Sequence, residues 1–459
     1  MNSSKFSLVL SELRQSIHIA LPLVVTYVVQ SSSSFVTTLM MAHLGKVELA
    51  AISLVWNLYI TAIIFFIGIL SSVSVLIAQQ RGAKKESDIN TIVSQSFVLS
   101  VFLVIPLMLV FWLVPPALRW SGQDPQVIRL VAETLYALNW SMFPLACLIV
   151  MTQFLIGLEK TRLVLFINIL QIPCEIGVNY VLIFGKFGFP KFGIAGLGYS
   201  YSIVFTLAAL VIGVSIARSS LGKRYRIFSN LWMLNKKYLL ELFRVGWPIG
   251  FMLVIEVAFG VAIAFLMGRI GVDALAAHQI TMQYWSLSMN VYFGFSETIA
   301  IRVGYEAGAN NPEGMRRAYY VNLGLSLFCV LVISLLFFVF PEHMIALDIN
   351  LHLPKYAAVV HWAEIFLAIC AFYQVFDAVR WLAIGALRGL KDTTYPMVVS
   401  GIIFWFVGLP FGYWLDRTMH LGGAGLWWGM FTGGVLGMFI LTRRFYRLEK
   451  QVDLVQLVT

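Results

Sequence analysis

Three carboxylates stand inside long apolar runs of the sequence. Glu256 lies between Val254-Ile255 and Val257-Ala258, Asp377 follows a run of aromatic and small residues, and Glu175 lies within an Ile- and Val-rich stretch. A charge at the centre of a membrane costs about 2.5–3.5 kcal/mol, so such a residue predicts a functional site. A carboxyl in a dry site favours its protonated form, and a carboxylate binds small hard cations through oxygen. These residues therefore predict binding of a proton or of a small hard cation.

The residues around these carboxylates leave structural alternatives open. Tyr373 precedes Asp377 by four residues and shares its helical face, which favours a common site. Arg380 follows Asp377 by three residues, so it could form an intrahelical ion pair and act as an internal surrogate for a bound cation. No basic residue lies within one helical turn of Glu256 along the sequence. Glu175 could instead make a polar bond to Asn or Ser on another helix.

The composition excludes a water-soluble protein. Of 459 residues, 60% are hydrophobic and 12% are charged, whereas soluble domains have about 25% charged residues. No HExxH, GxSxG or paired aspartate motif is present, so we do not expect an enzyme. No cofactor is expected apart from the proton or cation that the buried carboxylates bind. Four scattered cysteines indicate neither a disulfide framework nor a zinc site.

Twelve apolar runs are long enough to span a bilayer, which needs about 20 residues. They cover residues 16–42, 50–78, 93–115, 131–156, 163–184, 194–217, 241–269, 275–305, 317–340, 356–386, 395–415 and 422–442. With both termini inside, 24 basic residues fall on the inner side and 8 on the outer side. The positive-inside rule then places both termini in the cytoplasm. This distribution explains the net charge of +10 without a nucleic-acid partner.

Two halves of the chain repeat each other. Leu44-Gly45 through Ala51 recurs as Ile270-Gly271 through Ala277, an offset of 226 that also relates Pro22 to Pro248. The fold class predicted is an all-α integral membrane protein with twelve transmembrane helices in two six-helix lobes of the same topology. The lobes would cover residues 1–217 and 241–442, with a basic cytoplasmic linker at 218–240 and a cytoplasmic tail at 443–459. The linker suits a hinge between the lobes.

Several of these motifs resemble one transporter family. The duplicated Leu-Gly and Leu-Ala-Ala motif, Ala78-Gln79-Gln80-Arg81-Gly82-Ala83 and the run from Gly385 to Thr393 are similar to the multidrug and toxic compound extrusion (MATE) family. The glutamate in the seventh span resembles its NorM branch. The resemblance covers essentially the whole chain and implies antiport of amphipathic organic cations against sodium or protons by alternating access. It also implies that Glu256 and Asp377 bind the cation, sodium included, with Tyr373 beside them.

The resemblance further implies a central cleft between the lobes. Its expected lining is Tyr27, Gln30, Thr37, Gln283, Met252, Trp285, Met289 and Tyr292. Three positions depart from the family pattern: Thr37 replaces the usual aspartate, Arg380 the usual glutamine, and Glu175 an asparagine. We therefore expect that the N-terminal proton-binding or substrate-pairing carboxylate is Glu175, and that Arg380 modulates the site of Asp377.

A flippase for lipid-linked precursors is the alternative of related architecture. A flippase of this kind predicts a strongly basic cavity. Arg302 and Arg380 lie towards the cytoplasmic ends of their spans, and no other basic residue lies deep in a predicted span. The sequence favours a monomeric antiporter for antibiotic resistance in a bacterial inner membrane, with organic cations and the lipid bilayer as its partners. The substrate and the choice between sodium and proton do not follow from the sequence.

Overall fold

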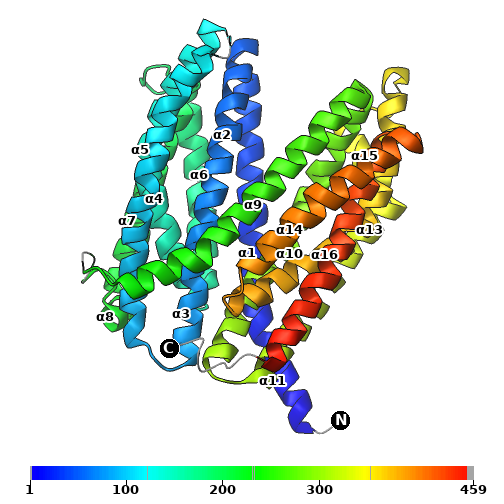
Figure 1. Cartoon of the computed structure of the whole chain (residues 1–459). Coiled ribbons are helices and arrows are strands. Elements are labelled where there is room, and N and C mark those ends of the chain that lie inside the picture. The colour runs from blue at the N-terminus through cyan, green and yellow to red at the C-terminus, as the bar shows by residue number, and fades with distance from the viewer. Residues whose placement is uncertain are drawn as a thin grey trace. The chain divides into compact units, whose positions relative to one another are not determined.

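The computed structural model describes residues 3–451, except 121, 123, 230, 232 and 352. Its described part is helical throughout (Figure 1). The elements are α1 (Ser3–Ala42), α2 (Lys46–Leu70), α3 (Ser72–Gly82), α4 (Ser87–Trp120), α5 (Pro125–Gly157), α6 (Thr161–Phe184), α7 (Ala195–Arg218), α8 (Ser220–Tyr225), α9 (Lys236–Ile270), α10 (Val272–Gly308), α11 (Pro312–Val339), α12 (Pro341–Asp348), η1 (Pro354–Tyr356), α13 (Ala357–Gly389), α14 (Thr394–Gly401), the π-helical η2 (Ile402–Gly408), α15 (Leu409–Thr418) and α16 (Gly423–Gln451).

Each of the twelve predicted spans corresponds to a long helix or to helices joined end to end. Eleven are long and apolar enough to cross a membrane; the twelfth, α10, is long but more polar. Helices satisfy all their backbone hydrogen bonds internally, which a segment inside hydrocarbon must do. The predicted all-α, twelve-helix membrane fold is therefore confirmed. Of the tail expected at 443–459, the first part continues α16 to Gln451, and the rest lies outside the described residues.

Capping residues set several helix ends. Asp124 accepts a hydrogen bond from the Gln126 backbone N–H at 2.7 Å, directly before Pro125 begins α5. Asn311 does the same for Gly314 at 3.1 Å, directly before Pro312 begins α11. Pro22 and Pro248 lie inside α1 and α9, not at the helix starts.

The chain divides into two compact units. Unit 1 comprises Met1–Val24 and Phe251–Thr459, and unit 2 comprises Val25–Gly250. The division falls inside α1 and α9, at positions that the repeat offset of 226 relates to each other. In each of these helices it lies two residues after the proline. A proline lacks an N–H and interrupts the helical hydrogen-bond ladder, so it locally weakens the helix there.

The duplication is visible in the backbone. Residues with positive φ occur in repeat-related pairs: Lys84 with Asn310, Glu159 with Lys391, and Gly193 with Gly422. The turns after α3 and α10 also share one pattern, in which Lys85 N bonds Gln80 O and Asn311 N bonds Glu306 O, both at 2.9 Å. The two halves therefore repeat loop conformations as well as hydrophobic runs.

The basic linker is bound to unit 2. The Asn90 amide of α4 donates to the backbone oxygens of Tyr225 and Arg226 at 2.9 and 2.6 Å. Gln95 bonds the oxygen of Met233 at 2.6 Å and accepts from the N–H of Asn235 at 3.1 Å. The linker is thus fastened along the start of α4, and its role as a hinge stays a prediction.

Carboxylates at the start of α4 hold the same linker. Arg224 pairs with Glu86, which also accepts from the Tyr225 hydroxyl at 3.2 Å. Burial and the nearby Glu86 carboxylate raise the pKa of Tyr225, so this phenol remains a hydrogen-bond donor at neutral pH.

Candidate functional site

Unit 1 contains a buried ion triad of Glu256, Asp377 and Arg380. The Arg380 Nε donates to Asp377 Oδ1 at 2.8 Å. Its Nη1 donates to Glu256 Oε1 at 2.7 Å, and its Nη2 lies 3.2 Å from Glu256 Oε2. The side chains of Asp377 and Arg380 are 0% and 1% exposed, and that of Glu256 is 18% exposed. The arginine therefore bridges two carboxylates contributed by α9 and α13.

Aromatic and small residues fix the position of the guanidinium. Its central carbon lies 5.0 Å from the ring centroid of Trp381 and 4.9 Å from that of Phe404, a cation–π geometry. Phe404 belongs to the π-helical η2, an element type that is frequent at functional sites. A Cβ placed on Gly437 of α16 would lie 2.7 Å from Arg380 Cδ, so the close packing of this arginine requires glycine there.

The triad has one more carboxyl group than it has cationic groups. Arginine does not lose its proton in proteins, so one positive charge faces two carboxylates. Burying charges is tolerated where pairing and hydrogen bonds replace water. Among the described residues, no further cationic side chain lies within 4 Å of either carboxylate. A triad with both carboxylates ionised has a net charge of −1, which one proton or one monovalent cation neutralises.

The triad adds a contact that the sequence did not indicate. Glu256 has a basic partner, because Arg380 reaches it from another helix across 124 residues of sequence; neighbours along one helix could not reveal this. Arg380 is 1% exposed, so protein encloses its charge. The pair of Asp377 and Arg380, expected from their spacing of three residues, forms.

The tyrosine that binds Asp377 is not the one indicated by spacing. Tyr292 of α10, expected only as a lining residue, donates to Asp377 Oδ2 at 2.8 Å. Tyr373 is 3% exposed, and its ring centroid lies 6.0 Å from that of Trp285. Tyr373 thus packs among aromatic groups on the helix that carries Asp377.

Unit 2 contains a different kind of polar cluster, centred on Glu175 of α6. The Ser33 hydroxyl of α1 donates to Glu175 Oε1 at 2.8 Å. One turn further along both helices, Asn179 donates to Thr37 Oγ1 at 3.4 Å. Tyr201 of α7 and Gln171 lie beside the same carboxylate. Glu175 is 7% exposed, and none of the described basic side chains pairs with it.

Sequence reasoning identified Glu175 and Thr37 but missed Ser33 and Asn179. A usable signal was present, since Ser33 and Thr37 are four residues apart, as are Glu175 and Asn179. Residues at this spacing share a helical face. Ser33 bonds Glu175 and, one turn further, Thr37 bonds Asn179, so the two pairs lie opposite each other on α1 and α6.

The other expected lining residues divide between the two units. Tyr27 and Gln30 lie on the part of α1 in unit 2, where the Gln30 amide donates to Asn168 Oδ1 at 2.8 Å. Met252 is buried in unit 1, and Gln283 is exposed there with its amide 3.4 Å from Asp348 Oδ1. Trp285 and Met289 are half-buried on α10. No cluster of three or more His, Cys, Asp or Glu side chains suited to a metal ion occurs among the described residues.

A second group of buried ions in unit 1 anchors the start of α1. Arg302 of α10 donates to both oxygens of Glu12 at 2.9 and 2.8 Å, and its Nη2 lies 3.2 Å from Glu306. Arg388 pairs with Glu297 at 2.9 Å. Bidentate Arg–carboxylate pairs fix geometry as well as charge. This group joins the first turns of α1 to α10 and is distinct from the triad.

Comparison with known proteins gives matches over nearly the whole chain. The MatE family model matches residues 22–181 and 248–414, one segment in each half. A probable multidrug resistance protein NorM from Mesorhizobium japonicum is 34% identical, with 94% of this chain and 93% of that protein covered. The multidrug resistance protein NorM of Burkholderia vietnamiensis is 32% identical, with 93% of this chain and 92% of the relative covered.

Solved structures support the same fold. A point mutant of the MATE transporter VcmN of Vibrio cholerae superposes with a TM-score of 0.89 at 16% identity, covering 98% of this chain and 99% of that one. The eukaryotic MATE transporter AtDTX14 gives a TM-score of 0.82 at 19% identity, covering 98% of both chains. Together with the family model and the close relatives, these likenesses show that the chain is a NorM-like member of the MATE family of membrane transporters.

Proposed function

We propose that this protein exports amphipathic organic cations in exchange for protons or sodium ions. Its NorM relatives are named as multidrug resistance proteins, which supports export of several different compounds. Two separate buried acidic sites carry the proposal: the triad in unit 1 and the Glu175 cluster in unit 2. Each has a carboxylate charge that no arginine or lysine of its described surroundings cancels. Binding one monovalent cation at such a site offsets the cost of burying that charge.

The two sites have different roles in this proposal. Glu175 binds a proton or pairs with the cationic substrate, because its neighbours are neutral hydroxyl, amide and phenol groups. In the triad, Arg380 takes the position that a cation would otherwise share between Glu256 and Asp377. The coupling ion, or the positive group of the substrate, therefore competes with this internal cation for Glu256, the most exposed member.

The charge of the triad favours cation export over the flippase alternative. A carrier of pyrophosphate-linked lipids needs free positive charge in its binding site, whereas Arg380 is outnumbered by carboxylates. We further propose a monomer in the bacterial inner membrane with both termini in the cytoplasm, no resident cofactor, and six-helix halves that alternate access.

Efflux of a fluorescent organic cation from proteoliposomes tests this function. A sodium gradient and a proton gradient are imposed separately on liposomes that contain the purified protein. We expect one gradient to accelerate efflux relative to protein-free liposomes. If neither gradient changes the rate, while a labelled lipid crosses the bilayer faster, the flippase alternative replaces this proposal.

A further inference from the structure

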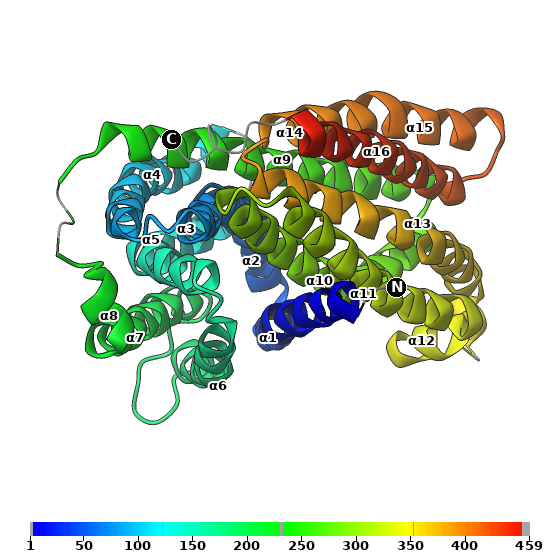
Figure 2. The ribbon, with the colours of Figure 1, turned by 90° about the horizontal axis from the view of Figure 1, so that it is seen from below.

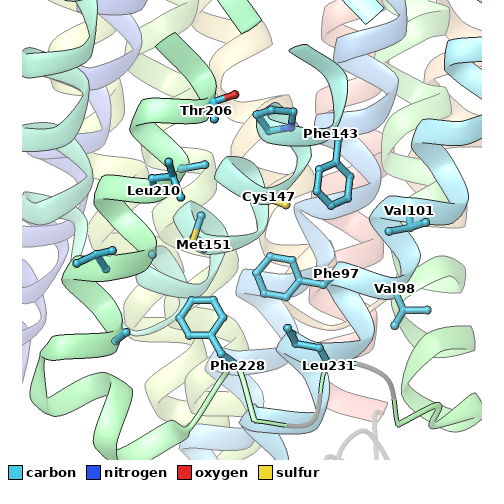
Figure 3. A pocket seen from close by; sticks show the side chains of 15 residues that line it. Phe97, Val98, Val101, Phe143, Cys147, Met151, Thr206, Leu210, Phe228 and Leu231 are labelled. Atoms are coloured by element: carbon cyan, nitrogen blue, oxygen red, sulfur yellow. The ribbon is translucent and has the colours of Figure 1, made fainter. Parts of the chain in front are cut away.

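An apolar cavity of about 540 Å³ lies in unit 2, away from the Glu175 cluster (Figure 3). Helices α4, α5 and α7 form its walls, and Phe228 and Leu231 of the linker close one end, opposite Thr206. Helix α5 packs against α4 on one side and α7 on the other, and the three follow one another in Figure 2. The wall consists of hydrocarbon and aromatic groups apart from the Thr206 hydroxyl and the sulfur atoms of Cys147 and Met151, and it includes no charged side chain.

The cavity is open towards the outer surface of the helices. Phe143, Leu210 and Val214 on its rim are 51%, 59% and 46% exposed. Gly213 leaves room between α7 and its neighbours, since a Cβ there would meet Met151 Sδ at 3.6 Å and Phe228 Cζ at 3.9 Å. From Thr206 to Ala217 the lining covers roughly 16 Å of helix at 1.5 Å per residue. That length is about half of the ~30 Å hydrocarbon core, or one leaflet.

Basic residues stand at the end that the linker closes. Arg218 follows the lining residue Ala217, and Arg226 precedes the lining residue Phe228 by two positions. Both are exposed, as is Lys223. Among the described residues, no carboxylate lies within 4 Å of any of the three; Glu86 is used by Arg224. Asn90 and Gln95 hold the linker, so the backbone that carries Arg226 stays beside the end of the cavity that the linker closes.

We infer that this cavity binds an anionic phospholipid, with an acyl chain along α7 and the phosphate at Arg218 and Arg226. An apolar slot one leaflet deep fits an acyl chain, and exposed basic residues at a membrane surface attract anionic headgroups. The same positive charges repel organic cations, so the slot is unsuited to the exported substrates. This inference is independent of the proposed function, because it uses neither acidic site.

Native mass spectrometry of the purified, delipidated full-length protein tests the inference. The protein is titrated with dioleoylphosphatidylglycerol or dioleoylphosphatidylcholine, and the occupancy of the first lipid is measured. We expect the phosphatidylglycerol to bind more tightly than the phosphatidylcholine. Each basic residue near a membrane contributes about 1 kcal/mol, so Arg218→Gln with Arg226→Gln should weaken binding of the phosphatidylglycerol roughly thirtyfold. Binding of the phosphatidylcholine should weaken less, because its choline group neutralises the phosphate charge.

Matched variants separate this site from general surface effects. Arg443→Gln with Arg447→Gln removes the same charge from exposed positions of α16 and should leave the preference unchanged. Gly213→Phe should fill the slot and weaken the binding of both lipids. Leu210→Trp serves the same purpose if Gly213→Phe does not fold. Val211→Phe, exposed on the same helix but outside the lining, should not.

Three results would overturn the inference. Equal affinity of the unaltered protein for both lipids would remove the role of the headgroup. Equal losses in the α16 control would assign the preference to overall charge. Binding of glycerol phosphate alone as tight as that of the whole lipid would remove the role of the acyl slot.

Discussion

The two acidic sites stabilise a buried carboxylate in different ways. In unit 1, Glu256 and Asp377 share a guanidinium that also lies against two aromatic rings. In unit 2, Glu175 has the Ser33 hydroxyl and neutral neighbours. The first site is an ion network that depends on charge balance, whereas the second is a single ionisable group in a polar pocket. Substitution should therefore affect mainly folding stability at the arginine and mainly transport at Glu175.

The largest expected effect follows loss of the arginine. Arg380→Met leaves two carboxylates buried without a counter-ion, which should lower the free energy of unfolding by about 3–5 kcal/mol. Adding Asp377→Asn removes one of these charges and should recover part of the loss. Thermal unfolding in detergent measures both variants. Equal stability of Arg380→Met and the unaltered protein would show that the triad does not depend on charge balance.

Removing one carboxylate from the triad should act on coupling. Glu256→Gln leaves the pair of Asp377 and Arg380 intact but removes the uncompensated negative charge. We expect a folded protein whose efflux no longer responds to an imposed gradient. Asp377→Asn should have the same effect on transport. Circular dichroism and size-exclusion profiles control for folding.

At the Glu175 cluster the expected effect is on pH dependence. Glu175→Gln keeps the side-chain shape and the bond from Ser33, so stability should change little, by less than about 1 kcal/mol. The pH dependence of efflux should become flat, because the carboxyl that titrates in this cluster is gone. Thr37→Asp combined with Glu175→Gln should restore part of it, since Thr37 lies one turn away in the same cluster. An unchanged pH profile in Glu175→Gln would leave Glu175 a structural group.

A comparison of stability distinguishes the two tyrosines of unit 1. Tyr292→Phe removes a hydrogen bond to a charged group, worth about 1.5–3 kcal/mol. Tyr373→Phe should cost less than about 0.5 kcal/mol, because its hydroxyl does not bond either carboxylate. Urea unfolding of both variants side by side gives the comparison. A larger loss for Tyr373→Phe would contradict the geometry described for Asp377.

Sequence alone predicted the fold well, because three independent features bear on it. The length of the apolar runs predicts the spans, the basic residues predict their orientation, and the internal repeat predicts the two halves. The carboxylates were found for the same reason: Glu256, Asp377 and Glu175 are conspicuous in apolar runs. The spacing of three residues also indicated the pair of Asp377 and Arg380. The partners on other helices were not identified, since Arg380 reaches Glu256 from a helix 124 residues away. The attachment of the linker was also hidden, because Asn90 and Gln95 bind its backbone atoms, which have no signature in the sequence.

Gradient-driven efflux of a fluorescent cation, measured in parallel for the unaltered protein, Glu256→Gln and Glu175→Gln, tests most directly whether each unit supplies one functional negative charge. Proteoliposomes with matched protein content are given the gradient that drives the unaltered protein. We predict that Glu256→Gln loses the response to the gradient and that Glu175→Gln loses its pH dependence, with both proteins folded. Full gradient-driven efflux with an unaltered pH profile in both variants would contradict this account.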